Sequence, residues 1–147
     1  MKMRRSQWLV FGQFFSLGLL YLPVKASYIS GGIYWTLLCL FISLALAYWT
    51  FRHNHLGKFN IVPELKEGAA LVRSGPYRWI RHPMYSSVTL LGLAALSWFA
   101  WWKILVLMVL LRVLYLKAKT EESLWCENTP EYHQYRDQTT MFIPFVL

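Results

Sequence analysis

Uncharged and charged stretches alternate along this chain in long blocks. Three blocks, at positions 6–24, 26–51 and 83–102, contain no Asp, Glu, Lys or Arg. Each block is close to the roughly 20 residues that an apolar helix needs to cross a bilayer. The pattern therefore predicts transmembrane helices.

A fourth apolar block follows the third directly, and it is the shortest. Only 13 residues separate Lys103 from Lys117, so lysine stems reaching toward the interface would have to extend it, and whether it is a full span stays open. We expect a single all-α membrane domain over residues 1–147, a polytopic transmembrane helical bundle of about four spans. The predicted segments are spans at 7–24, 33–51, 83–100 and 103–119, a central loop at 52–82 and a C-terminal segment at 120–147.

Proline, glycine and tryptophan mark the ends of these blocks. The segment from Pro23 to Gly32 is expected to separate the first helix from the second, because it holds serines and adjacent glycines. Pro83 suits the first position of a helix, since proline has no N–H to leave unpaired there. Trp101 and Trp102 are placed at the far membrane interface, where aromatic residues are enriched.

Under this topology, most of the positive charges lie on one side of the membrane. The chain carries a net charge of +8, and twelve of its fifteen Lys and Arg residues fall at the N-terminus, in the central loop, or at the C-terminal end of the fourth span and beyond it. By the positive-inside rule, both termini and the central loop are cytoplasmic, in a cytoplasmic membrane of the bacterial type. Attraction to anionic lipid accounts for the basic excess, so nucleic-acid binding is not required. A cleaved signal peptide is disfavoured because no small-x-small site ends the first block.

Candidate chemistry is concentrated just before the third predicted span. The run Arg73-Ser74-Gly75-Pro76-Tyr77 makes a rigid turn, and Arg81-His82-Pro83-Met84-Tyr85 leads into the helix. The helix N-terminus offers backbone N–H groups and a partial positive charge, which favour an anionic group such as a carboxylate. Arg73 and Arg78 are explained equally well as topology anchors.

A second cluster follows the fourth predicted span. Glu121 and Glu122 lie about one turn past the membrane, and Glu131-Tyr132 comes shortly after them. None of the seven carboxylates of the chain falls within a predicted span. Adjacent glutamates are often only a solvated helix end. Because this pair emerges on the same side as the His82 segment, however, we expect the two clusters to share a pocket.

Together these runs resemble the isoprenylcysteine carboxyl methyltransferase and phospholipid methyltransferase family of integral membrane enzymes. The resemblance covers about residues 60–144, and it departs from the family at Asn128-Thr129-Pro130, where a Phe-Gly is common. It implies S-adenosylmethionine as the cofactor and methyl transfer to a lipid-like substrate. The cofactor-binding residues that it implies are Tyr77, Arg81, His82, Pro83, Tyr85, Glu121, Glu122 and Tyr132.

Methyl transfer from a sulfonium is an in-line displacement, so the protein mainly aligns the reactants and excludes water. A glutamate could accept hydrogen bonds from ribose hydroxyls, and a tyrosine ring could face the sulfonium. His82 is a candidate base if the acceptor is an amine, whereas a carboxylate acceptor needs none. Arg112, a charge inside a span, is a second catalytic candidate that could hold a substrate carboxylate or phosphate, or it could snorkel from a short span.

Two other function classes remain as alternatives. A small four-span transporter fits the size, although such proteins usually need a carboxylate within the membrane. A membrane reductase of the sterol-reductase type would use NADPH in place of S-adenosylmethionine. No metal site is expected, because His53 and His55 lack a third ligand at a suitable spacing. The expected partners are the lipid bilayer and an amphipathic or lipid-like substrate; the acceptor and the oligomeric state are left open.

Overall fold

The computed structural model describes residues 2–23, 32–54, 70–97 and 100–144, and these residues are helical with no strand among them. The expectation of an all-α chain is confirmed. The α-helices are α1 (Lys2–Leu20), α2 (Gly32–His53), α3 (Pro83–Ala94), α4 (Trp101–Asn128) and α5 (Glu131–Gln138), and the short 3-10 helices are η1 (Gly75–Arg78) and η2 (Ala95–Ser97).

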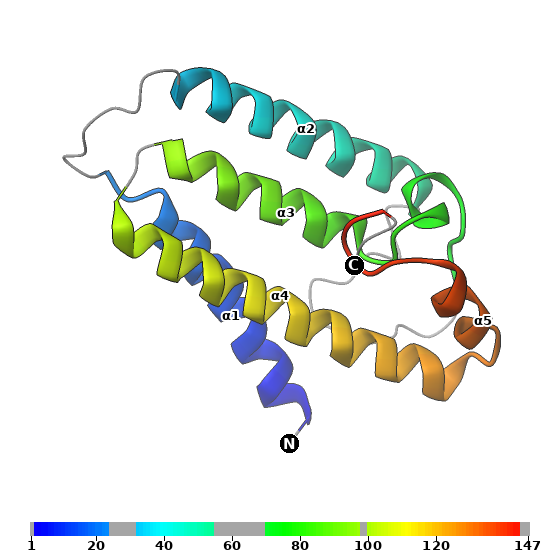
Figure 1. Cartoon of the computed structure of the whole chain (residues 1–147). Helices are drawn as coiled ribbons and strands as arrows, with labels where there is room; N and C mark the ends of the chain where they lie inside the picture. Colours follow the sequence, from blue (N-terminus) through cyan, green and yellow to red (C-terminus); the bar gives the residue numbers. More distant parts are fainter. Residues whose placement is uncertain (1, 24–31, 55–69, 98–99, 145–147) are drawn as a thin grey trace.

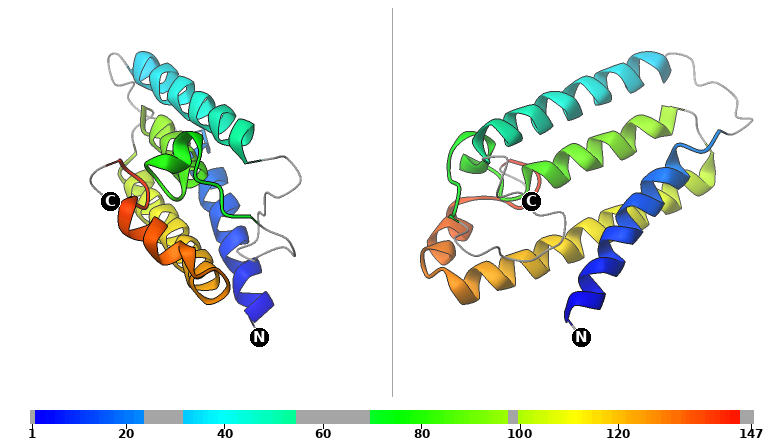
Figure 2. Two further views of the ribbon diagram at one scale, coloured as in Figure 1. Left: turned by 90° about the vertical axis from the view of Figure 1, so that its right-hand side faces the viewer. Right: turned by 180° about the vertical axis from the view of Figure 1, so that it is seen from behind.

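The long helices form two pairs that meet along one seam. Helix α2 packs along α3, and α1 packs along α4 (Figure 1). Helix α3 also contacts α4, which joins the two pairs. Figure 2 shows from behind that α1 crosses α4, while α5 turns back at the far end of α4.

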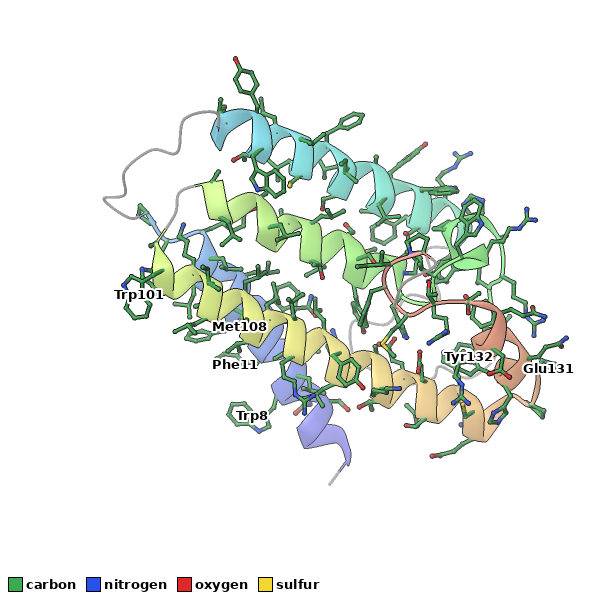
Figure 3. All side chains as sticks on the ribbon, viewed as in Figure 1. Trp8, Phe11, Trp101, Met108, Glu131 and Tyr132 are labelled. Carbon is green, nitrogen blue, oxygen red and sulfur yellow. The ribbon has the colours of Figure 1, made fainter. Side chains whose placement is uncertain are left out.

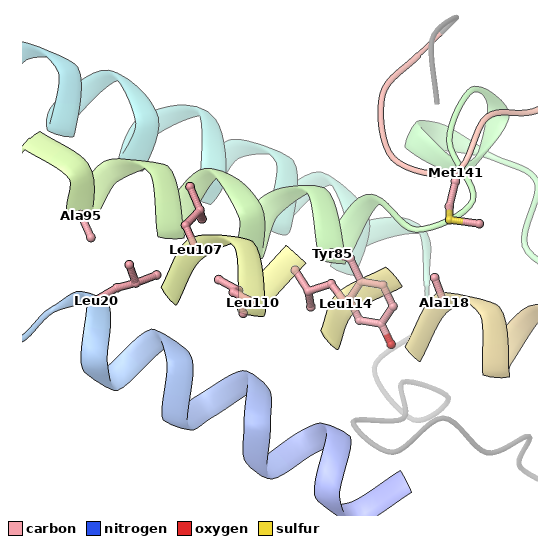
Figure 4. Packing of buried hydrophobic residues seen from close by; sticks show 8 residues of the cluster. All are labelled: Leu20, Tyr85, Ala95, Leu107, Leu110, Leu114, Ala118 and Met141. Carbon is pink, nitrogen blue, oxygen red and sulfur yellow. The ribbon is translucent and has the colours of Figure 1, made fainter. Parts of the chain in front are cut away.

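The seam between the pairs is apolar and close-packed. Its buried side chains come from α1, α3, η2, α4 and the segment after α5 (Figure 4), namely Leu20, Tyr85, Ala95, Leu107, Leu110, Leu114, Ala118 and Met141. Gly92 permits the close approach of α3 to α4, because a Cβ there would lie 3.0 Å from both Leu107 and Leu110. The seam therefore fixes where the N-terminal end of α3 sits relative to α4.

The outer helix faces are rich in exposed apolar side chains. Trp8 and Phe11 on α1, and Trp101 and Met108 on α4, all point outward (Figure 3) and are more than half exposed. A large exposed apolar surface of this kind suits a lipid environment. Among the described helices, α2 is the one long and apolar enough to cross a membrane, and residues 83–97 form a shorter apolar helix. The number of spans and the side on which the termini lie stay predictions.

The helices differ in extent from the predicted spans, and α1 and α3 end earlier than predicted, at Leu20 and Ala94. Helix α1 begins at Lys2, ahead of position 7, and α4 continues past position 119 to Asn128. Glu121 and Glu122 therefore lie on the same helix as the predicted fourth span. Helix α3 begins at Pro83 as its sequence indicates. The turn predicted between the first two spans falls largely on 24–31, and much of the central loop falls on 55–69; both ranges lie outside the described residues.

Candidate functional site

The two glutamates of α4 face the histidine that precedes α3. Glu121 Oε2 lies 3.4 Å from His82 Nδ1, and Glu122 Oε1 lies 3.4 Å from His82 Nε2. The structure thus brings together the two clusters that the sequence placed on one side. Although Nε2 is within ion-pair reach of Glu122, the geometry is not that of a hydrogen bond. This buried nitrogen has no hydrogen-bond partner among the described residues.

Arg81 locks Glu122 into place. Its Nε donates to Glu122 Oε1 at 2.7 Å, and both side chains are less than one-tenth exposed. Its Nη1 donates to the carbonyl oxygens of Arg136, at 3.0 Å, and Thr139. Arg81 therefore ties α4 to the end of α5 through its Nε and Nη1 groups.

Tyr85 links the histidine to the other glutamate. Its hydroxyl donates to Glu121 Oε1, and its ring stacks on His82 with centroids 5.4 Å apart and planes 9° apart. The Lys117 ammonium lies 5.0 Å from the centre of the Tyr85 ring. The Tyr85 ring therefore contacts His82 and Lys117. The sequence suggested instead that a tyrosine ring could face a sulfonium. Pro83 is buried at the start of α3.

The two glutamates differ in accessibility. The Glu121 side chain is 23% exposed, whereas that of Glu122 is 5% exposed. Lys119 Nζ, on the outer side, is 3.8 Å from Glu122 Oε2. Glu121 is therefore the carboxylate of the pair that a ligand can reach, and Glu122 is enclosed by its partners.

The charges of the cluster stabilise one another. Burial alone would lower the pKa of His82, but its contacts with the oppositely charged carboxylates of Glu121 and Glu122 raise it above the ordinary value. Burial alone would raise the pKa of Glu122, but the contact with His82, the hydrogen bond from Arg81 and the positive charge of both bring it down to about 2. His82 thus retains its proton at higher pH than a free imidazole, so less of it is in the neutral form that could accept a proton.

The other predicted tyrosines lie beside this cluster and pack with the protein. Tyr77 accepts a hydrogen bond from Asn54 at 3.1 Å, and its carbonyl accepts one from Tyr135 at 2.7 Å. Burial, with the Glu121 charge, raises the pKa of Tyr77 to about 12, although the Asn54 hydrogen bond acts against it. Tyr132 is buried and stacks on Trp125 with centroids 6.0 Å apart.

A short extended segment closes the cluster from the C-terminal side. We call residues 139–142 the C-terminal clasp. The backbone N–H groups of Arg81 and His82 donate to the carbonyls of Thr140 and Met141 at 2.9 and 3.1 Å. The Phe142 ring lies 6.1 Å from that of His82, and its carbonyl accepts a hydrogen bond from Ser86 at 2.6 Å. The clasp therefore holds the backbone at Arg81 and His82 and the side chain of Ser86.

The structure does not bring Arg112 to this cluster. Arg112 is exposed on α4, and its guanidinium lies 5.7 Å from the centre of the Tyr115 ring. This placement differs from the sequence-based expectation that Arg112 faces the bundle. The expected free N–H groups of α3 are also fewer, because those of Tyr85 and Ser86 donate to the His82 carbonyl.

Sequence reasoning missed Lys117, which was counted only among the basic residues beside the membrane. Lys117 lies four residues before Glu121, and residues at this spacing share one face of a helix. The spacing could have placed it at the site. Gln13 of α1, which accepts a hydrogen bond from Lys117, and Phe142 of the C-terminal clasp carry no comparable pattern.

Comparison with known families gives one match. The model of a family described as phospholipid methyltransferase matches residues 32–129, about two thirds of the chain. The matched range runs from α2 to the end of α4 and includes His82, Tyr85, Glu121 and Glu122. Neither a curated protein nor a solved structure matches the chain.

Proposed function

Because this chain belongs to the phospholipid methyltransferase family, we propose that it transfers a methyl group from S-adenosylmethionine to a lipid-like acceptor. The family itself indicates a membrane methyltransferase, and the long apolar helix α2 agrees with a membrane location. The proposal adds the cofactor, the residues that bind it and the class of acceptor. It also places the site on the cytoplasmic face of a cytoplasmic membrane, because the basic residues of the sequence gather on that side.

The observation that carries the proposal is the pairing of Glu121 with His82. Glu121 is partly exposed and has oxygen lone pairs beyond those used by Tyr85 and His82. His82 is buried beside it, and its Nε2 lies 3.4 Å from Glu122 Oε1 without a hydrogen bond. A carboxylate suits the two hydroxyls of a ribose, and an imidazole N–H suits the carboxylate of an amino acid. The residues present therefore fit the polar groups of S-adenosylmethionine.

The residues of the cluster take different roles in this proposal. S-adenosylmethionine, when bound, supplies a methyl group on a positively charged sulfur. Glu121 binds the ribose hydroxyls and adds negative charge near that sulfur. Arg81 and Glu122 hold α4 against the His82 segment, and this fixes the geometry within which an in-line displacement takes place.

The role of His82 is binding and orientation. Its two flanking carboxylates favour its protonated form, so removing a proton from an amine acceptor would fall to another group. The family description favours a phospholipid amine as the acceptor, with an isoprenylcysteine carboxylate as the second candidate. The exposed apolar helix faces support an acceptor that arrives from the lipid.

Calorimetry with S-adenosylhomocysteine on the detergent-purified protein tests the cofactor. We expect the wild-type protein to bind and Glu121→Gln to lose at least about tenfold in affinity, because a neutral amide accepts hydrogen bonds more weakly than a carboxylate. Glu127→Gln is the matched control, since Glu127 lies exposed near the end of the same helix. Binding of NADPH in place of S-adenosylhomocysteine would contradict the proposal.

Membranes incubated with methyl-labelled S-adenosylmethionine test the acceptor. Label that extracts with the lipid fraction supports a phospholipid acceptor, whereas label that stays with protein and is released as methanol by base points to a carboxylate. Membranes with Glu121→Gln should incorporate little label in either fraction.

A further inference from the structure

Helix α1 reaches the candidate site through a buried lysine. Lys117 on α4 is 2% exposed, and its Nζ donates to Gln13 Oε1 of α1 at 2.6 Å. Gln13 belongs to a buried polar stripe on the face of α1 that also includes Ser6 and Ser16. This stripe lies outside the family-matched residues 32–129. Helix α1 thus does more than anchor the chain in an apolar phase.

A buried ammonium among apolar helices is costly unless it is paired. Gln13 supplies one acceptor, and the Tyr85 ring offers its face at 5.0 Å. The negative charge of Glu121, one helical turn further along α4, also acts on the Lys117 ammonium. Lys117 therefore lies between the side-chain amide of Gln13 and the ring of Tyr85, whose hydroxyl donates to Glu121.

Lys103 provides an internal comparison on the same helix. It is 1% exposed, and its Nζ donates to the carbonyl of Ala95 at 3.3 Å while lying 5.9 Å from the centre of the Trp102 ring. Lys103 lies about four turns away from Lys117 and contacts no member of the cluster around His82. Burial of a lysine on α4 therefore occurs twice, but only one of the two lysines contacts the candidate site.

We propose that Lys117, held in place by Gln13 of α1, is a positioning residue that fixes the Tyr85 hydroxyl on the Glu121 carboxylate and so orients that carboxylate toward the cofactor. This inference rests on the proposed function, since it assigns Glu121 to cofactor binding. It adds a contribution of α1 to a site whose other members lie on α3, on α4 and in the residues just before α3. Neither Lys117 nor Gln13 touches the cofactor in this assignment.

The test measures the Kd of S-adenosylhomocysteine and the separate KM values of S-adenosylmethionine and acceptor. Lys117→Met should raise the Kd and the cofactor KM about tenfold and leave the acceptor KM within about twofold. Lys117→Arg, which keeps the charge over the ring, should recover most of the affinity. Lys103→Met is the matched control, because it removes an equally buried ammonium far from the site, and its Kd should stay within about twofold of wild type.

A double-mutant cycle separates positioning from general loss of structure. If Lys117 acts through Tyr85, Lys117→Met combined with Tyr85→Phe should weaken binding little more than Tyr85→Phe alone. If the fold-changes in Kd of the two single variants multiply in the double variant, the proposal is overturned. A Kd for Lys117→Met that matches the Kd for Lys103→Met would also overturn it. If Lys117→Met fails to fold, Gln13→Leu takes its place, and we expect it to lose about threefold in affinity for S-adenosylhomocysteine. An unchanged Kd for Gln13→Leu would equally overturn the proposal. A wild-type protein that binds no S-adenosylhomocysteine would instead overturn the proposed function, and this inference with it.

Discussion

Polar groups are paired at both ends of the helix bundle, but with different kinds of partner. Where α2 and α4 begin, the donors pair with neighbouring backbone or hydroxyl oxygens. Trp35 donates to the carbonyl of Leu93 at 3.0 Å, and Thr36 donates to the hydroxyl of Ser97 at 2.5 Å. At the opposite end, charged side chains from the residues just before α3 and from α4 pair with one another.

The difference separates groups that hold helices together from groups that can bind a ligand. A neutral pair satisfies a donor and an acceptor on two adjacent helices, and few polar groups remain free to bind a ligand. The charged cluster combines residues some 40 positions apart, such as Arg81 and Glu122, and still leaves the His82 Nε2 without a hydrogen bond. A buried polar atom without a partner is costly, and such atoms concentrate where a ligand is to be bound.

The largest effect is expected from breaking the charged pair at the site end. Arg81→Met leaves the Glu122 carboxylate buried without its guanidinium, which should lower the free energy of unfolding by about 3–5 kcal/mol. Thr36→Val removes a neutral hydrogen bond at the other end and should cost only about 1 kcal/mol. Thermal unfolding of both variants in the same detergent measures the difference. Equal losses would mean that the two ends do not differ as described.

Stability should also depend on pH at the site end, in opposite directions for its two titrating groups. The pKa of Glu122 is lowered to about 2, so its contribution is present above its unfolded value near 4.5 and is lost as the pH falls toward 2. The pKa of His82 is raised, so its contribution is present below its unfolded value near 6.5 and is lost as the pH rises through the folded value. Both contributions are complete between about pH 4.5 and 6.5.

Unfolding midpoints measured across this range check the expectation. The acid limb should flatten in Glu122→Gln, and the alkaline limb should flatten in His82→Gln. Thr36→Val should keep the wild-type pH profile, because no ionisable group is lost. A Glu122→Gln profile identical to wild type would show that the carboxylate is not stabilised by its partners.

The smallest effect is expected at Arg112. Because its guanidinium is exposed and lies over Tyr115, Arg112→Ala should leave methyl transfer and S-adenosylhomocysteine affinity within about twofold of wild type. Lipid extraction after incubation with methyl-labelled cofactor provides the measurement. A loss of tenfold or more in activity would return Arg112 to the mechanism and extend the site beyond the His82 cluster.

The sequence anticipated the meeting of His82 with the two glutamates because each lies close to the end of an apolar block. Pro83 marked the start of α3, and the side of the membrane given to each block followed from the basic residues. These features are local, and they can be read from position along the chain. The role of the cluster in cofactor binding stays a proposal.

The direction in which Arg112 and Lys117 face could not be predicted in the same way. Helix α4 is apolar nearly all round over its first half, so no polar stripe marks its outer face and the pattern leaves its rotation undetermined. That rotation is set by packing at Leu107, Leu110 and Leu114 against α1 and α3. The C-terminal clasp was missed for a different reason, because it pairs backbone groups and so leaves no mark on the side chains.

The C-terminal clasp has a consequence for the order in which the protein is made. Helices α2 and α3 leave the ribosome before residues 139–142 do. Until those residues emerge, the backbone N–H groups of Arg81 and His82 lack the carbonyls that hold them, and Phe142 does not cover the histidine. The cluster around His82 is therefore completed only after residues 139–142 have emerged.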